Sequence, residues 1–356
     1  MPGVSTVVAA SFRVMSILAK RLRAQLLAGG KADAPLPVVE RLLAIQAQDA
    51  RGARLAIRAR SAGLRAADVD TALTADRSLV ITWLNRGTLH LVRSDDYPWL
   101  QQLTAPQLRT ATARRLSQEG VTPDAAERGV AAIERALAED GPLERDRLRE
   151  RVAAASVRTH GQAFVHLLAL ASIRGLIVRG PMLGGRQAFV LVRDWLGEAG
   201  PIDRDRALAE LARRYLAGHG PATAADLGKW AGLPLRDARL GLQAIASELH
   251  QDEGDLVDLK RRATTARLPD PQLLGSFEPV LLGWTNRDEI LGEDAARVVS
   301  GGVFRAFALV RGRAAATWTI SRGAVKLEPF RPLSSADRSA LETEAADVTR
   351  YLQERE

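Results

Sequence analysis

Apolar residues recur at the spacing of amphipathic helices up to residue 74, and the spacing then changes to that of strands. Two β-type runs over residues 79–84 and 88–92 are joined by Asn85-Arg86-Gly87, which predicts a hairpin turn. Helices followed by a hairpin form the outline of a winged helix, so we expect one in this part of the chain. The predicted helices cover residues 11–27, residues from 37 onward, 53–61 and 67–74.

The same outline recurs twice after a helical passage over residues 97–118. The second copy has three helices, the last of which ends at Gly175. Two strands then flank a glycine-rich loop at 180–185. Three similar units in a row predict a tandem array. The predicted helices and strands of the second copy are 125–138, 143–154, 162–174, 176–179 and 186–192, and those of the third are 204–216, 222–230, 234–249, 256–260 and 264–268.

The pattern changes again after Pro269, where short apolar runs are separated by turn residues. These runs predict a small antiparallel β domain, closed by a helix over residues 335–353. The runs cover residues 277–284, 303–310, 314–320 and 325–330. The whole chain therefore predicts a helix-rich α+β fold with four parts, at residues 1–94, 95–198, 199–269 and 270–356.

The composition is that of a globular protein, with 46% hydrophobic and 26% charged residues among 356. The chain contains no cysteine, which excludes disulfides, a thiol nucleophile and zinc sites with cysteine ligands. None of the five histidines belongs to an H-E-x-x-H motif, so we expect neither a metal centre nor a cofactor.

The formal net charge is +8, and only five of the 50 basic residues are lysines. Arginine binds phosphate through two parallel hydrogen bonds. The positive net charge and the excess of arginine over lysine therefore favour nucleic acid as the partner. No segment reaches 18 uncharged apolar residues, and the apolar amino terminus has no basic leader. We therefore expect a cytoplasmic protein without membrane contact.

Residues 42–49 are the most informative segment, because Gln46, Gln48 and Asp49 occur at the end of an otherwise apolar helical pattern. Buried polar groups cost free energy unless another group satisfies them. Two glutamines with one small residue between them can orient a water or the edge of a ligand without carrying charge. The alternative is that these side chains cap the helix end or face solvent.

Four segments together resemble one protein family, the AlkZ-like, YcaQ-related winged-helix DNA glycosylases. The resemblance extends over nearly the whole chain, and the order and spacing of the segments are more specific than any one of them. The segments are residues 43–48 (Leu43-Ala44-Ile45-Gln46-Ala47-Gln48), 83–92, 225–233 and 277–284.

The resemblance implies a C-shaped scaffold of three winged helices with a β-barrel-like domain around a basic channel for duplex DNA. It also implies a monofunctional glycosylase that hydrolyses the N-glycosidic bond of N7-alkylated purines, including bulky adducts and interstrand crosslinks. Such an enzyme serves in DNA repair or in self-resistance to a crosslinking antibiotic of the azinomycin kind. The family's catalytic element is a glutamine, an apolar residue and a glutamine or aspartate, which Gln46-Ala47-Gln48 matches in its glutamine form. We expect a monomer associated with the nucleoid.

An alkylated purine leaves without protonation, so a glutamine carbonyl that positions water would suffice for catalysis. We assign this role to Gln48 and assign Gln46 to holding the sugar, phosphate or water network. Asp49 is the nearest electrostatic support, unless it only solvates the helix end. His90, in an alternating strand, is expected to contact DNA or to support the site rather than to catalyse.

Several polar residues at predicted turns could contact DNA, although each could equally be plain surface charge. An arginine at a hairpin turn can reach a phosphate or enter the minor groove. Trp83 and Trp284 are instead expected in the core. The candidate DNA contacts are Arg86, Asn286, Arg287, Arg311 and Arg313.

Two other functions fit parts of the pattern. A DNA-binding regulator without activity would need only the winged helices. A nuclease would use carboxylates clustered around Mg²⁺, and the sequence has no convincing cluster. The preferred adduct, the antibiotic and whether one or both strands of a crosslink are released do not follow from the sequence.

Overall fold

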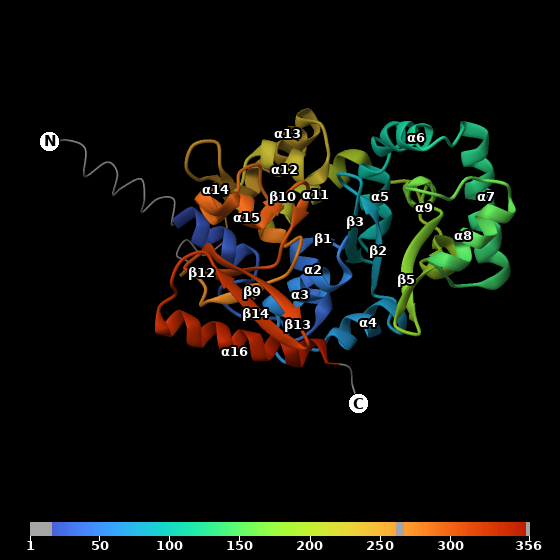
Figure 1. Cartoon of the computed structure of the whole chain (residues 1–356). Helices are drawn as coiled ribbons and strands as arrows, with labels where there is room; N and C mark the ends of the chain where they lie inside the picture. Colours follow the sequence, from blue (N-terminus) through green and yellow to red (C-terminus); the bar gives the residue numbers. More distant parts are fainter. Residues whose placement is uncertain (1–15, 261–266, 354–356) are drawn as a thin grey trace. The chain divides into compact units, whose positions relative to one another are not determined.

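Most of the predicted helices and the first hairpin are present in the computed structural model, which describes residues 16–260 and 267–353 (Figure 1). Residues 16–24 are helical, and the earlier part of the predicted helix 11–27 lies outside the described residues. The next three helices are α2 (Pro35–Leu42), α3 (Ala50–Arg60) and α4 (Ala66–Thr74). The chain divides into two units. Unit 1 comprises Met1–Asp68, Leu208–Trp230 and Pro234–Glu356, and unit 2 comprises Val69–Ala207 and Ala231–Leu233.

Unit 2 contains the predicted hairpin, formed by β2 (Leu79–Leu84) and β3 (Thr88–Arg93) in antiparallel register. Asn85 and Gly87 at its turn have φ values of 53° and 80°, the left-handed conformation that such a tight turn needs. The sheet continues through β5 (Ile177–Leu183), β6 (Arg186–Leu191) and β4 (Leu143–Glu144), in the order β3-β2-β5-β6-β4.

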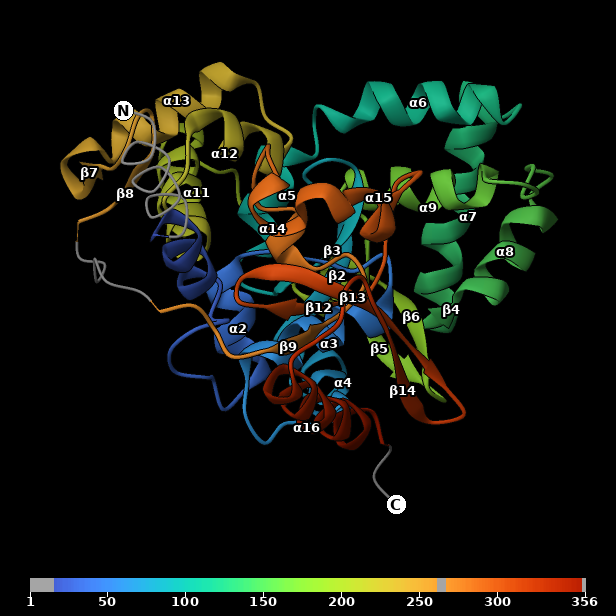
Figure 2. The same ribbon diagram turned by 60° about the vertical axis from the view of Figure 1, so that its left-hand side comes forward.

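Helix α9 (Ala163–Ile173) packs against α6 and α7 and against β2 and β5 of the sheet, and its residues from Phe164 to Ile173 are mostly buried. Its predicted apolar face is confirmed, since Phe164, Leu167, Leu168 and Ala171 are at most 1% exposed. Figure 2 shows α6, α7, α8 and α9 of this unit beside one another. The α-helices between residues 97 and 195 are α5 (Tyr97–Thr104), α6 (Leu108–Gln118), α7 (Pro123–Asp140), α8 (Arg145–Ala154), α9 and α10 (Val192–Trp195), so the predicted passage over 97–118 is two helices.

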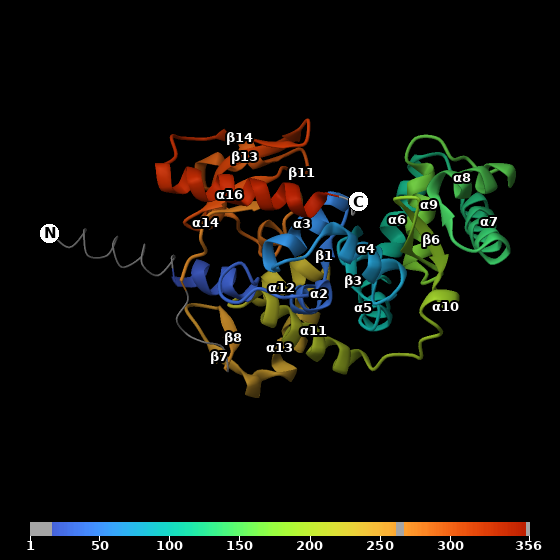
Figure 3. The same cartoon turned by 90° about the horizontal axis from the view of Figure 1, so that it is seen from below.

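Unit 1 contains an antiparallel sheet of order β14-β13-β12-β9 with α16 (Ser335–Leu352) packed beside it (Figure 3). Its strands are β9 (Gln272–Leu274), β12 (Phe307–Val310), β13 (Arg313–Ser321) and β14 (Ala324–Pro329). Among the described strands, β14 and β9 are edges and no closed barrel forms. The remaining short elements nearby are α14 (Asp288–Leu291), η3 (Gly292–Asp294), α15 (Ala295–Val298), β10 (Val299–Ser300) and β11 (Val303–Phe304).

One strand prediction and one strand pairing in unit 1 are wrong. The apolar run at 277–284 contains the 3-10 turn η2 (Pro279–Leu281) instead of a strand, because proline at its start removes a donor and fixes φ. The predicted strand 256–260 of the third copy is confirmed as β8 (Val257–Leu259), but β8 pairs with β7 (Leu249–Gln251), and most of the predicted partner 264–268 lies outside the described residues. Its helices are α11 (Arg204–His219), α12 (Ala224–Ala231) and α13 (Leu235–Ala244), followed by η1 (Ala246–Glu248).

Helix α3 is held in unit 1 by an arginine in the core. Arg58 is 2% exposed and donates to the Leu273 carbonyl at 2.7 Å, to Glu344 at 2.7 Å and to Asp347 at 2.9 Å. The Tyr351 hydroxyl donates to a backbone carbonyl of α3 at 2.9 Å. A buried guanidinium is tolerated only with such partners, so α3 is fixed against α16 and β9.

We expect Gly52→Ala to destabilise unit 1. This is the opposite of the intrinsic helix preference, by which alanine in a helix interior is about 1 kcal/mol more stable than glycine. A Cβ at Gly52 would lie 2.3 Å from the carbonyl oxygen of Ser276, a backbone atom, so α3 would have to move. Denaturant unfolding should show that the free energy of unfolding of the variant is about 1–3 kcal/mol below that of the native protein. As a control, Gly30→Ala meets no atom within 4 Å and should change stability by less than about 0.5 kcal/mol. Equal stabilities of the two variants would contradict the packing.

Candidate functional site

The Gln46-Ala47-Gln48 motif lies between two helices of unit 1, after α2 and before α3. Helix α2 ends at Leu42, and Leu43 follows it with φ of 64°, which turns the chain out of the helix. The strand β1 (Ile45–Gln46) comes next. Leu43, Ile45 and Ala47 are at most 3% exposed, so their burial fixes the backbone from which the two amides project. The motif therefore follows the helix end predicted from the sequence rather than belonging to it.

The two glutamine side chains contact each other directly. The Gln46 Nε2 atom donates to the Gln48 Oε1 atom at 2.6 Å. Gln46 is 6% exposed, whereas Gln48 is exposed, so the buried amide orients the one that solvent can reach. An amide oxygen has two lone pairs, and one of those on Gln48 remains for a further donor such as water.

Asp49 forms the amino-terminal cap of α3. Its carboxylate accepts from the Arg51 backbone N–H at 3.0 Å, and the side chain is half-buried. A carboxylate at this position satisfies an otherwise unpaired N–H and interacts favourably with the helix dipole. The structural alternative for Asp49 therefore holds, and its electrostatic role in catalysis stays a prediction.

His90 lies in β3 of unit 2 and is 2% exposed. Its Nδ1 atom is 2.9 Å from the Thr88 carbonyl oxygen. Burial, assisted by the positive charge of Arg86, lowers the pKa of His90 from 6.5 to about 3. At neutral pH the ring is uncharged, so it can offer hydrogen bonds but cannot act as a general acid.

Three further polar residues on the same hairpin were not singled out from the sequence. Asn85 and Thr82 are 0% exposed, and Thr82 lies opposite His90 in the β2–β3 register. Within the described residues, neither amide atom of Asn85 nor the hydroxyls of Thr82 and Thr88 have a hydrogen-bond partner. Unpaired buried polar atoms are rare and need an explanation. Polar positions recurring through an otherwise apolar hairpin were the signal in the sequence.

The predicted DNA contacts of unit 1 lie around α14 and the β12–β13 turn. Asn286 accepts from the Asp288 N–H at 2.7 Å, and Arg287 stacks over Phe304 at 5.3 Å, with its pKa lowered by burial. Exposed Arg311 pairs with Asp337 at 3.4 Å, and Arg313 lies near Gly292 at the end of α14. Arg86, in unit 2, is half-buried at its hairpin turn.

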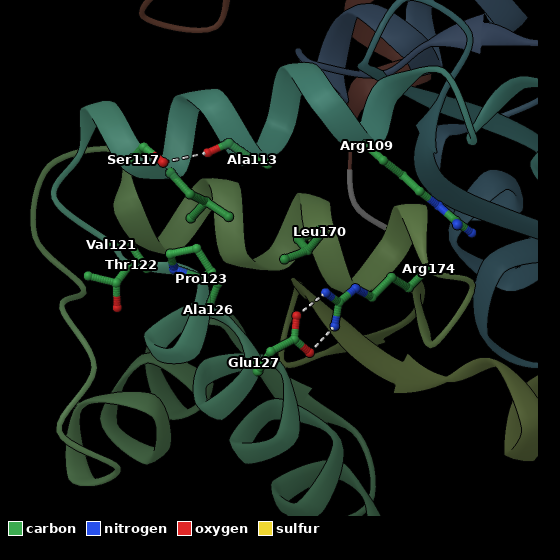
Figure 4. A pocket seen from close by; sticks show the side chains of 11 residues that line it. Arg109, Ala113, Ser117, Val121, Thr122, Pro123, Ala126, Glu127, Leu170 and Arg174 are labelled. Atoms are coloured by element: carbon green, nitrogen blue, oxygen red, sulfur yellow. Dashed lines mark hydrogen bonds and ion pairs between the residues drawn. The ribbon is translucent and has the colours of Figure 1, made fainter.

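Unit 2 also contains a mainly apolar cavity of about 490 Å³ between α6, α7 and α9 (Figure 4). Glu127 and Arg174 form a bidentate ion pair at its wall. Hydrogen bonds from Arg174 lower the pKa of Glu127, and those to Glu127 raise the pKa of Arg174. The side chains beside this pair include Ala126 and Leu170. Nothing in the sequence analysis pointed to this cavity.

The described residues contain no group of three or more histidine or acidic side chains placed to hold a metal ion. No helix in the same part of the chain is long and apolar enough to cross a membrane.

The sequence model of a family described as DNA glycosylase AlkZ-like matches residues 39–351. The chain belongs to this family. A relative from Streptomyces sahachiroi, named interstrand DNA cross-link repair glycosylase, is 29% identical over 360 residues, which cover 94% of this chain and 95% of the relative. The resemblance found in the sequence is thus confirmed, and the protein is an enzyme of the DNA glycosylase class.

The fold of this glycosylase is that of a solved structure, Streptomyces sahachiroi DNA glycosylase AlkZ. The two share a TM-score of 0.74 and 25% identity, over 95% of this chain and 96% of that one. The prediction of a mixed helix and sheet fold is confirmed at this level.

We expect His90 to make the glycosylase less stable in acid. The unfolded chain takes up a proton on this histidine below pH 6.5, whereas the native ring excludes it until about pH 3. The neutral buried ring therefore contributes its full share to the free energy of unfolding above pH 6.5, and this share is lost as the pH falls toward 3. By pH 5 the loss is about 2 kcal/mol. Urea unfolding at pH 7 and pH 5 should show this extra loss in the native protein and not in His90→Gln. The same loss in both proteins would contradict the assignment.

Proposed function

We propose that the protein hydrolyses the N-glycosidic bond of N7-alkylated purines in duplex DNA, including bulky adducts and interstrand crosslinks. Membership of the AlkZ-like family and the cross-link repair name of the S. sahachiroi relative support this substrate class. The observation that carries the proposal is the pair of neutral amides, a buried Gln46 bonded to an exposed Gln48.

The chemistry needs positioning rather than a strong acid. An alkylated N7 leaves the purine positively charged, so the C1′–N9 bond breaks with its electron pair going to the base and neutralising it. A water oxygen then bonds to C1′ and gives its proton to solvent. Gln48 accepts a hydrogen bond from this water, and its dipole stabilises positive charge on the sugar. Gln46 holds Gln48 in place and contacts the sugar–phosphate network.

A base tethered to the opposite strand cannot be drawn into a closed pocket, as in ordinary base flipping. A crosslink-opening enzyme therefore needs its water-positioning group on an accessible surface. The exposure of Gln48 fits this requirement.

We assign DNA contacts to Arg86, Arg311 and Arg313, whose exposed or half-buried guanidinium groups can bind phosphate. Asn286, Arg287 and His90 have mainly local partners, and we assign them to shaping the same surfaces. The net charge of +8 favours a polyanionic partner.

A chromosomal substrate places the enzyme at the nucleoid, in the cytoplasm. We propose that it acts there as a monomer and protects against a crosslinking antibiotic of the azinomycin kind.

The winged-helix division at 1–94, 95–198, 199–269 and 270–356 is also part of the proposal, with an open four-stranded sheet in place of the expected barrel-like domain. The order α7-β4-α8-α9-β5-β6, with β4 paired to β6 and β6 to β5, supports the second winged helix.

The test is incubation of the protein with a duplex that bears one N7-methylguanine, followed by alkali. Strand breaks that appear only after alkali indicate an abasic product and a monofunctional glycosylase. Breaks without alkali would indicate a lyase, and no release of the base would refute the proposal. Activity in EDTA separates this chemistry from that of a Mg²⁺ nuclease.

We expect Gln46→Ala and Gln48→Ala each to slow single-turnover excision about 100-fold or more, because each removes a group that positions the water. Affinity for the damaged duplex should change little. Gln243→Ala, at an exposed glutamine on α13 of the same unit, is the matched control and should excise at the native rate. Native rates in both motif variants would rule out the assigned roles.

A further inference from the structure

The segment Gly275-Ser276-Phe277-Glu278 lies along α3, the helix that begins two residues after Gln48. A Cβ on Gly52, in the first turn of α3, would meet the Ser276 carbonyl oxygen at 2.3 Å. A Cβ on Gly275 would lie 2.9 Å from Leu55 Cβ. Backbone approaches this close require glycine on both sides, so the segment and the helix fit in only one register.

The other end of α3 is bound by a charge pair from the same segment. Arg60 and Glu278 are both 0% exposed, and an Arg60 Nη2–H donates to Glu278 Oε1. The Arg60 guanidinium also donates to the Gln25 carbonyl at 2.7 Å, to the Gln25 side chain at 2.9 Å and to the Ala56 carbonyl at 2.8 Å. Glu278 belongs to the 277–284 segment that the sequence resemblance marked and that the proposed chemistry leaves unused.

Stability alone does not account for this pair. Replacing a fully buried ion pair by apolar side chains of similar volume is often neutral or stabilising, because two charges must be desolvated to form it. The pair instead fixes the orientation of the Arg60 side chain, because a guanidinium surrounded by four acceptors can form all of its hydrogen bonds in only one orientation.

Two residues with positive φ lie near the proposed site in the sequence, one before the Gln46–Gln48 pair and one before Glu278. Leu43, three residues before Gln46, has φ of 64°, and Phe277, one residue before Glu278, has φ of 54°. Large side chains rarely adopt this left-handed conformation, which persists only where the surroundings enforce it. The Phe277 ring packs against Phe304, with centroids 5.6 Å apart.

We infer that Arg60 and Glu278 are positioning residues for the Gln46–Gln48 pair, and this rests on the proposed function of that pair. They fix the place of α3 along its axis, and α3 starts at the Asp49 cap, next to Gln48. A shift of about 1 Å at a reacting group costs about 100-fold in rate.

The decisive variant is Arg60→Met with Glu278→Leu, which removes both charges and keeps the volume. We expect cooperative unfolding at a Tm below native, because the acceptors of Gln25 and Ala56 lose the Arg60 donor. At a temperature where the variant is folded, we expect unchanged affinity for the N7-methylguanine duplex and at least 10-fold slower single-turnover excision. The matched control is Arg213→Met with Glu248→Leu, which removes a bidentate pair of α11 and η1 in the same unit and should excise at the native rate.

Excision at the native rate in the Arg60–Glu278 double variant would overturn the inference. If that variant loses cooperative unfolding, Glu278→Gln takes its place under the same criteria, because it keeps the size and removes only the charge. Slow excision by either, with affinity intact, supports a positioning role.

A readout independent of activity separates this inference from the proposed function. The side-chain amide protons of Gln46, buried and bonded to Gln48, should give NMR signals that exchange slowly with water in the native protein. In the double variant they should exchange as fast as those of exposed Gln243. Slow exchange in both would overturn the positioning role, whereas a native protein that orders Gln46 but releases no base would refute only the glycosylase substrate.

Discussion

A guanidinium group enters a protein core only when acceptors surround it, and this constraint organises unit 1. Helix α3 carries Arg58 and Arg60 into the interior, and their carboxylate partners come from the far end of the chain, at Glu278 and Glu344. The charges of Arg58 and Arg60 are therefore paired by residues outside the first 68. The helix that follows the candidate catalytic motif is held in place by the carboxy-terminal third of the chain.

Charge is divided in a consistent way between structure and candidate chemistry. The buried Arg58 and Arg60 pair with carboxylates, whereas the groups assigned to the reaction, Gln46 and Gln48, are neutral. His90 is neutral as well, because burial lowers its pKa. A neutral amide can be buried with one hydrogen bond, while a lone carboxylate there would need a cation of its own. Such a site suits a substrate that brings its own positive charge.

Local patterns were reliable for elements that are buried along most of their length. The β-type runs over 79–84 and 88–92 gave β2 and β3 within one residue, and the apolar spacing of 162–174 gave α9 within one residue at each end. They failed at 277–284, where Glu278 and Gly283 interrupt the apolar residues and no strand forms. A mostly apolar run signals burial without specifying conformation, and here Pro279 favours the turn η2 over a strand.

The sequence by itself determined the fold class, the family and the Gln46-Ala47-Gln48 motif, because these depend on local periodicity and on short segments in a fixed order. Only the tertiary structure decided that Gln46 is buried and Gln48 exposed, and that Glu278 meets Arg60 across 218 residues. It also revealed that the buried side-chain amide of Asn85 has no hydrogen-bond partner among the described residues. A pairing so distant leaves no periodic signal along the chain, since its partners become neighbours only after the helices between them have packed.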